Sequence, residues 1–235
     1  YGSRVKSSSD KNLFDCMFLL CISLSIEMMA GRRGISEMAQ KKLIVLVDLD
    51  ETLAGFEEHF LKKYRQIYPN EPYIPLEDRN TFYISDQYDK LTHSDDYLKK
   101  IYRSQYFFRD LPEIEGGCKA VKEMAEMEGV EVFICSSPLF QYKYSAPEKF
   151  EWVENHLGKD WINRLILTRD KTLIHGDLLI DDLVDIKGVV KKPPWKHIVF
   201  MSCHNKHTNL KGKTYLNNWT DGTWRSLIED FKKRI

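Results

Sequence analysis

The sequence lacks an excess of charge of either sign. Lys and Arg together number 35, as do Asp and Glu, so the formal net charge of the 235-residue chain is zero. Proteins that bind DNA or RNA polymers usually carry a clear basic excess, because contacts to phosphates dominate their affinity. We therefore expect no nucleic-acid polymer as a partner, and any anionic ligand must be bound by a local group of side chains.

Cysteine is scarce and unpatterned. The chain has five cysteines, at irregular spacings and without a CxxC motif. An odd, irregular set excludes a disulfide framework and favours a reducing compartment. The string CHNKH at residues 203–207 has no second ligand pair at zinc-finger spacing, so we interpret it as structural.

Long hydrophobic runs are also missing. The longest apolar run near the beginning covers residues 16–26, which is short of the roughly 20 residues that a membrane span needs. We expect no membrane association. Met38 directly precedes the first strand pattern, and we interpret residues 1–37 as a leader or an extension outside the folded domain. We expect a cytoplasmic protein. The arginine-containing string GRRGIS at residues 31–36 keeps a mitochondrial location as the alternative.

What the sequence does contain is an alternation of strand and helix patterns. Strand patterns cover residues 42–48, 130–137, 163–168, 177–182 and 197–202, and helix patterns cover 117–129, 147–158 and 219–235. Such alternation predicts an α/β fold, a Rossmann-like parallel sheet with helices on both faces.

One long segment interrupts this alternation. Residues 56–110 contain no strand-like run, and the strings FEEHFLKKYRQIY (56–68) and YLKKIYRSQYFF (97–108) have helical spacing. We predict a small helical cap at 56–110, inserted after the first strand. The core then consists of residues 38–55 and 111–235.

Polar side chains follow the predicted strands. In parallel α/β sheets the ligand lies beyond the carboxyl ends of the strands. The residues at those ends are Asp48, Asp50, Ser136, Ser137, Arg169, Lys171, Asp181 and Asp182. This set of carboxylates, hydroxyls and cations along one sheet edge is suited to phosphoryl transfer.

Each of these side chains has a chemical task in that reaction. Asp48 can attack phosphorus and form an aspartyl-phosphate. Asp50 can protonate the leaving oxygen and then activate water, provided that its surroundings raise its pKa. Lys171 can offset negative charge, and Ser136 can donate a hydrogen bond to a phosphate oxygen.

A group of carboxylates would repel phosphate without a hard cation. Mg²⁺ prefers oxygen ligands, so Asp48, the carbonyl of Asp50 and a carboxylate from Asp181 or Asp182 are suited to it. The sequence therefore predicts a Mg²⁺-dependent phosphatase. A DxD or DD motif alone is more often a turn or a helix terminus, and the specificity comes from the order of the four pieces.

Those pieces, LIVLVDLDETL, VFICSS, RDKT and LLIDD, resemble the four motifs of the haloacid dehalogenase-like phosphatases. From about Lys42 to the C-terminus the chain resembles the 5′(3′)-deoxyribonucleotidases of that superfamily, of cytosolic and mitochondrial type. The resemblance implies hydrolysis of nucleoside monophosphates, preferably pyrimidine deoxyribonucleotides, by a homodimer. It also implies Asp182 as the metal ligand, with Asp181 as an alternative. The substrate-binding positions that it implies are Phe56, Phe82, Tyr83, Ile84, Tyr102, Phe108, Ser137 and Arg169.

The chain departs from this family at several positions. Where the family's first motif usually reads DMDGVLADF, this sequence reads DLDETLAGF, so Glu51 replaces a glycine and Gly55 replaces an acid. Phe140 stands where mitochondrial members carry a lysine. These changes bear on base and sugar preference.

Two alternative functions follow from the same residues. The string DLDETL also resembles phosphatases that act on phosphoserine in proteins, but a cap over the site favours small substrates. A non-enzymatic scaffold is the other alternative. Such copies usually lose the nucleophile or the metal-binding acids, and none is missing here.

Overall fold

The computed structural model describes residues 41–91 and 95–234, and the chain from Lys42 onward forms one compact unit. The predicted leader at residues 1–37 lies outside the described residues. Among the described helices, none combines the length and the apolar character that crossing a membrane requires.

The centre of this unit is a parallel sheet of six strands in the order β3-β2-β1-β4-β5-β6. The strands are β1 (Leu43–Val47), β2 (Val130–Ser136), β3 (Leu165–Leu167), β4 (Leu178–Asp181), β5 (Lys196–Phe200) and β6 (Thr214–Leu216). The predicted parallel α/β fold is confirmed. Sequence patterns did not predict β6, because its string TYL has only one buried apolar side chain, Leu216, and so lacks the apolar run that marks the equally short β3.

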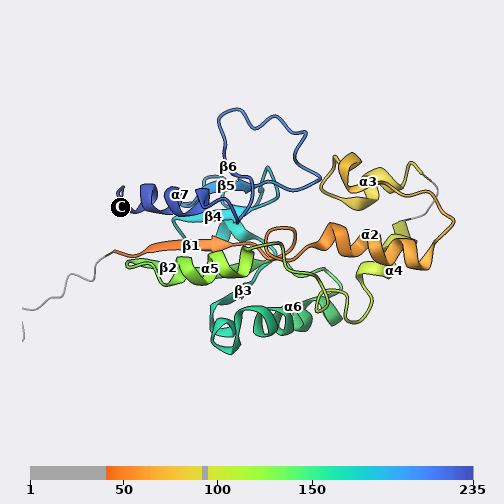
Figure 1. Ribbon diagram of the computed structural model, residues 1–235, viewed down its shortest axis with the longest axis horizontal. Helices are drawn as coiled ribbons and strands as arrows, with labels where there is room; N and C mark the ends of the chain where they lie inside the picture. Colours follow the sequence, from red (N-terminus) through yellow and green to blue (C-terminus); the bar gives the residue numbers. More distant parts are fainter. Residues whose placement is uncertain (1–40, 92–94, 235) are drawn as a thin grey trace, which may run out of the picture. The chain divides into compact units, whose positions relative to one another are not determined.

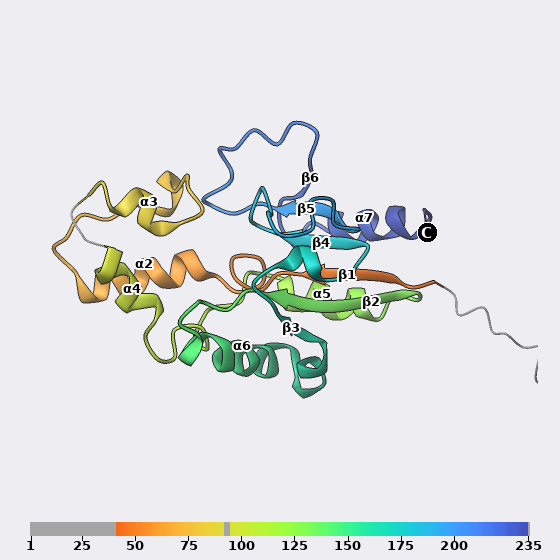
Figure 2. The ribbon, with the colours of Figure 1, turned by 180° about the vertical axis from the view of Figure 1, so that it is seen from behind.

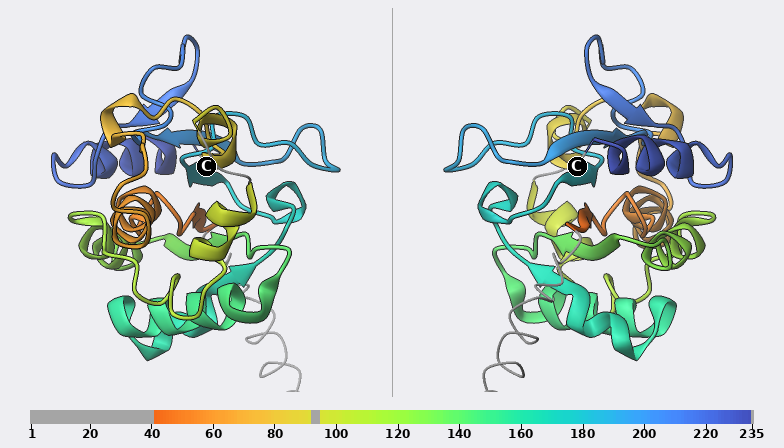
Figure 3. Two further views of the ribbon diagram at one scale, coloured as in Figure 1. Left: turned by 90° about the vertical axis from the view of Figure 1, so that its right-hand side faces the viewer. Right: turned by 90° about the vertical axis from the view of Figure 1, so that its left-hand side faces the viewer.

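The helices of the sheet region pack on one face of the sheet. They are α5 (Gly117–Ala125), α6 (Tyr142–Leu157) and α7 (Thr223–Lys232). Leu43, Val45 and Val47 of β1 point to this face, because alternate side chains of a strand share a face, and they join the larger hydrophobic core. Figure 3 shows α5 and α7 on the same side of the sheet.

The other face has a smaller apolar cluster that includes Leu46, Cys135, Leu179 and Trp195. Helices were predicted on both faces, but the helical cover of this face is reduced to the single turn η3 (Lys171–Leu173), because the connections from β3 to β4 and from β4 to β5 form no longer helix. The 183–195 connection supplies much of the rest, as Figure 3 shows.

Two helices begin at other residues than predicted. Helix α6 begins at Tyr142, five residues before Pro147, so the proline lies inside the helix and does not start it. Helix α7 begins at Thr223, because residues 218–222 form turns in which the Asp221 side chain accepts a hydrogen bond from the Thr223 N–H. Pro147 was misleading as a start signal because α6 continues past it. Trp219 was misleading because a turn closed by the Asp221 side chain comes between it and α7.

Residues 56–110, which we call the helical insert, contain helices and no strand among their described residues. The elements are α2 (Phe56–Ile67), η1 (Leu76–Asp78), α3 (Ile84–Tyr88) and α4 (Asp95–Tyr102). The predicted helix at 97–108 ends early, at Tyr102, and the chain continues in turns where Tyr106 has a left-handed backbone and donates its N–H to Glu148 of α6 at 2.5 Å. Figures 1 and 2 show these helices beyond the carboxyl end of β1. The division into core and cap stays a prediction.

Candidate active site

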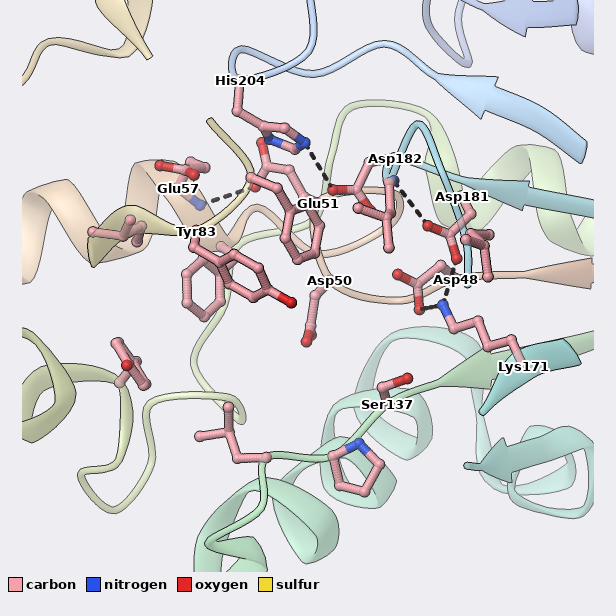
Figure 4. A pocket seen from close by; sticks show the side chains of 18 of the residues that line it. Asp48, Asp50, Glu51, Glu57, Tyr83, Ser137, Lys171, Asp181, Asp182 and His204 are labelled. Atoms are coloured by element: carbon pink, nitrogen blue, oxygen red, sulfur yellow. Dashed lines mark hydrogen bonds and ion pairs between the residues drawn. The ribbon is translucent and has the colours of Figure 1, made fainter. Parts of the chain in front are cut away.

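The carboxyl ends of the central strands bring together acidic side chains from distant parts of the chain. Asp48 follows β1, Asp181 ends β4, and Lys171 begins η3, a turn stabilised by the Asp170 side chain. Lys171 Nζ lies 2.6 Å from Asp48 Oδ1 and 2.6 Å from Asp181 Oδ2. Figure 4 shows both contacts. The buried ammonium group of Lys171 therefore joins the ends of β1 and β4, which are neighbours in the sheet.

Asp50 reaches the same site because the chain turns sharply after β1. The N–H groups of Leu53 and Ala54 both donate to the carbonyl of Leu49, which closes a tight turn. Both acids of the DxD motif can therefore face one cavity, as the sequence predicted from their spacing. Asp50 Oδ1 is buried without a hydrogen-bond partner among the described residues, and such an orphan acceptor is suited to a ligand.

Three of these carboxylates could hold a metal ion. Oxygen atoms of Asp48, Asp181 and Asp182 all lie within 4.8 Å of one another, and the three residues are buried. All the donors are oxygen atoms, which hard cations prefer. Lys171 contacts two of these three carboxylates, and its single charge cannot offset all of them, so the residues fit a cation that supplies further positive charge.

Burial dominates the electrostatics of the site. It raises the pKa values of Asp48 and Asp50, and it raises that of Asp182 well above its ordinary value, with help from the neighbouring Asp181 and Asp48. Burial alone would lower the pKa of Lys171, but Asp181 and Asp48 together raise it above its ordinary value. Lys171 therefore stays protonated, whereas the ionised forms of the buried carboxylates are unfavourable until a cation binds beside them.

A second buried lysine was missed by the sequence analysis. Lys149 of α6 is fully buried, and its Nζ lies 2.6 Å from Asp50 Oδ2 and 3.1 Å from Ser136 Oγ. The available signal was its position three and four residues before Trp152 and Val153, on the buried face of the helix. A lysine in an apolar stripe needs a buried partner.

A cavity of about 500 Å³ opens beside these acids. All eight positions predicted to bind substrate line it, together with Asp48, Asp50, Lys171, Asp181 and Asp182. Ser136 does not line the cavity. It is fully buried beneath it against Lys149, whereas its neighbour Ser137 is exposed to the cavity.

The aromatic side of the cavity comes mainly from the helical insert. Phe56, Tyr102 and Phe108 form one group of packed rings, and Phe82 and Tyr83 form another at the opening, where they are 41% and 64% exposed. Figure 4 shows the Tyr83 side chain pointing across the cavity toward Asp50. An apolar, aromatic wall opposite a charged one can bind a molecule with a flat ring at one end and an anionic group at the other.

His204 also lines the cavity, although we interpreted its string CHNKH as structural. Its Nε2 lies 3.3 Å from Asp182 Oδ2, and burial lowers its pKa to about 4. Glu57, Cys203 and His204 lie close enough to hold a metal ion. However, the Glu57 carboxylate is already bound at both oxygens by Arg79, so that group is a poor metal site.

The chain matches a known family over most of its length. Residues 42–228 match the model of the family described as 5′ nucleotidase, deoxy (pyrimidine), cytosolic type C protein. The chain belongs to this family. Membership places it among the phosphoric monoester hydrolases.

Curated human relatives are similar to most of the chain. The mitochondrial 5′(3′)-deoxyribonucleotidase of Homo sapiens is 41% identical over 91% of this chain and 95% of its own length. The human cytosolic type is 43% identical over 79% of this chain and 92% of its own length. Because the relatives include proteins of both compartments, the cytoplasmic location stays a prediction.

Solved structures share the fold at low sequence identity. A haloacid dehalogenase-like protein from Agrobacterium tumefaciens has a TM-score of 0.55 at 13% identity, covering 80% of this chain and 98% of its own. A hydrolase of the same superfamily from Deinococcus radiodurans, crystallised with bound phosphate and sodium, has a TM-score of 0.52 at 13% identity. It covers 82% of this chain and 98% of its own. The predicted haloacid dehalogenase-like fold is thereby confirmed.

Proposed function

We propose that the protein is a Mg²⁺-dependent nucleotidase that hydrolyses nucleoside monophosphates, preferably pyrimidine deoxyribonucleotides, to nucleoside and phosphate. The observation that carries the proposal is the convergence of Asp48, Asp181, Asp182 and Lys171 at one end of a cavity with aromatic walls at the other. The names of the human relatives, 5′(3′)-deoxyribonucleotidases, support the nucleotide substrate.

In the first step a carboxylate oxygen of Asp48 attacks phosphorus, and the bond from phosphorus to the ester oxygen breaks. Asp50 gives its proton to the departing nucleoside oxygen. Burial raises the pKa of Asp50, which favours the acid form that this step needs, while Lys149 acts against that rise. Lys171 keeps Asp48 oriented through its 2.6 Å contact.

In the second step water attacks the aspartyl-phosphate, and Asp50, now a carboxylate, takes a proton from that water. Inorganic phosphate leaves, and Asp48 returns to its carboxylate form with Asp50 protonated again. Lys149 and Lys171 offset the negative charge that builds up beside phosphorus. Ser137 lines the cavity, and we assign it to the phosphate end, with Ser136 acting behind it through its contact with Lys149.

Asp48, Asp182 and the carbonyl of Asp50 would hold Mg²⁺, with Asp181 as the alternative ligand. When bound, Mg²⁺ would offset the charge of the carboxylates and of the phosphate that approaches them. The clustering of Asp48, Asp181 and Asp182 oxygens within 4.8 Å of one another and the raised pKa values of Asp48 and Asp182 support a site completed by an additional cation.

The helical insert would act as a cap that binds the nucleoside. Phe82 and Tyr83 stand at the opening, and Phe56, Tyr102 and Phe108 extend the aromatic wall inward. Arg169 lies over the exposed ring of Phe140 at 5.4 Å, on the side of the cavity formed by the sheet region. A flat base between aromatic rings is favoured by stacking, whereas a folded protein would not enter.

The experiment is a panel of phosphate esters assayed with Mg²⁺ and with a chelator. We expect phosphate release from dUMP and dTMP to exceed release from purine nucleotides, and release to stop with the chelator. A phosphoserine peptide hydrolysed faster than dUMP would instead support the protein phosphatase alternative. Equal activity with and without chelator would contradict the metal requirement.

Asp48→Asn tests the nucleophile itself. The variant keeps the side-chain shape and should lose at least about a thousandfold in kcat, since a covalent step is removed. The matched control is Asp185→Asn, which changes an exposed aspartate paired with Lys213 outside the cavity and should leave kcat unchanged. Normal turnover by Asp48→Asn would remove Asp48 as the nucleophile.

We also propose a homodimer, as the resemblance implies. Sedimentation at micromolar concentration would test it, and a monomer at all concentrations would contradict it.

A further inference from the structure

Glu51 holds a backbone conformation that its side chain makes unfavourable. Its φ is +56°, in the left-handed region where residues with a Cβ are strained. Only Tyr106 shares this property among the described residues other than glycine. Glu51 is also the residue that stands where the resembling family has glycine, the amino acid best suited to this conformation. A strained residue persists when its surroundings compensate for it, so the contacts of the Glu51 side chain indicate its role.

The Glu51 carboxylate joins two parts of the molecule that the chain does not connect directly. Oε2 accepts the N–H of Glu57, in the first turn of α2, at 2.9 Å. Oε1 accepts the hydroxyl of Ser202, which follows β5, at 2.9 Å. Figure 4 shows Glu51 between α2 and His204 at the edge of the cavity. The Glu51 side chain therefore links the first helix of the insert to Ser202 in the sheet region, which lies 151 positions after Glu51 in the sequence.

The Ser202 end of this link reaches the acids and the aromatic wall. Ser202 Oγ lies 3.1 Å from His204 Nδ1, and His204 Nε2 lies 3.3 Å from Asp182 Oδ2. The His204 ring also meets the Phe82 ring edge to face, with centroids 5.4 Å apart. The segment that Glu51 anchors thus contacts one side chain from each wall of the cavity.

The Glu57 end of the link supports the opening of the cavity. Glu57 binds Arg79 through both oxygens, at 2.8 and 2.9 Å, and Arg79 donates to the carbonyl of Thr81 at 3.0 Å. The loop that these contacts hold continues directly into Phe82 and Tyr83. Moving the start of α2 would therefore move the residues proposed to bind the nucleoside.

We propose that Glu51 is a positioning residue that fixes the helical insert against the Ser202–His204 segment and so sets the distance between the aromatic wall and the acidic end of the cavity. The inference rests on the proposed function for its substrate. A long side chain with two polar end atoms is needed because each oxygen of Glu51 binds a different partner, and glycine, although it would relieve the backbone, offers neither contact.

Three variants separate this role from a general effect on folding. Glu51→Gly removes the link and relieves the strained φ, so the variant should fold. Glu51→Gln keeps an acceptor for the Glu57 N–H and can donate its amide hydrogen to Ser202 Oγ. Glu58→Ala is the matched control, because it removes an exposed carboxylate from the same turn of α2.

We expect Glu51→Gly to raise KM for dUMP roughly five- to tenfold, the usual value of one or two lost hydrogen bonds, with kcat changed less than about threefold. Amide exchange at Glu57 should accelerate by a similar factor. Glu51→Gln and Glu58→Ala should match the unsubstituted protein in both measurements. If Glu51→Gly is poorly folded, Ser202→Ala removes the other end of the link and should raise KM in the same direction.

A KM and a Glu57 exchange rate that stay unchanged in Glu51→Gly would overturn the inference, and so would a KM increase that glutamine fails to rescue. A fall in kcat alone would also overturn it, because it would make Glu51 part of the chemistry. Failure of the proposed function looks different, since the unsubstituted protein would then release no phosphate from any nucleotide. Amide exchange would still test the link in that case.

Discussion

Replacing Arg79 by methionine should cost the protein much of its stability. The Arg79 side chain is 1% exposed and that of Glu57 is 5% exposed, and two hydrogen bonds of 2.8 and 2.9 Å join them. Arg79 also donates to Gln87 and to the carbonyl of Thr81. Methionine retains the apolar length of the side chain but leaves the Glu57 carboxylate buried without its cation.

The expected magnitude follows from that uncompensated charge. Removing one partner of a buried ion pair typically costs about 3 to 5 kcal/mol, far more than the pair itself contributes relative to apolar residues. A domain of this size has a free energy of unfolding of only about 5 to 15 kcal/mol. Arg79→Met should therefore lower the urea midpoint strongly. Combining Arg79→Met with Glu57→Leu should recover most of the lost stability, because no buried carboxylate is then left without its cation.

Urea unfolding of the single and double variants measures both effects in one cycle. The control is Arg65→Met, which changes an exposed arginine of α2 that stacks over Tyr73 at 4.6 Å and should cost less than about 1 kcal/mol. A loss in Arg79→Met no larger than in the control would refute the reasoning. A double variant less stable than Arg79→Met would also refute it, since the damage would then come from lost packing.

Two further predictions concern pH. Lys149→Met removes the cation 2.6 Å from Asp50, so the pKa of Asp50, already raised by burial, should rise further. The alkaline limb of the kcat/KM profile, which needs the acid form of Asp50, should move up equally, and an unmoved limb would exclude Lys149 from this role. His197 lies in β5, and burial lowers its pKa from 6.5 to about 4. The folded protein keeps this imidazole neutral while the unfolded chain protonates it, so stability is lost as the pH falls from 6.5 toward 4. Urea unfolding should show a loss of about 2 to 3 kcal/mol from this group between pH 7 and 4.5, and His197→Gln should lose correspondingly less. Equal losses in both proteins would contradict the assignment to His197.

The strand ends could be predicted because their signals are local. An apolar run followed by a carboxylate placed Asp48 and Asp181 at the sheet edge, and the order of parallel strands then brought them together. Lys171 was predicted in the same way, from its place before the β4 strand. The structure adds the atomic contacts, with Lys171 lying 2.6 Å from each of those two carboxylates.

The remaining site residues depend on contacts that no local pattern encodes. The spacing of Lys149 to Trp152 and Val153 could mark it as buried, but only the packing of α6 shows that its Nζ meets Asp50. His204 belongs to a string that lacks metal-site spacing, and only the path of the 201–213 connection brings it to Asp182. Ser136 was predicted at the phosphate end from its place after β2, but it is buried against Lys149 while Ser137 lines the cavity.

This contrast has a physical origin in how the two walls of the cavity are built. The acidic wall is attached to hydrogen-bonded strands, so its geometry is fixed by the register of the sheet, for example Val45 against Leu178. The aromatic wall is attached to short helices and a loop, and its placement depends on a few buried polar contacts such as Arg79 with Glu57 and Glu51 with Ser202. Changes in those contacts can shift the aromatic wall without disturbing the strands. Substrate preference should therefore respond to substitutions in the insert much more readily than the phosphoryl-transfer chemistry does, because the two depend on separately anchored groups.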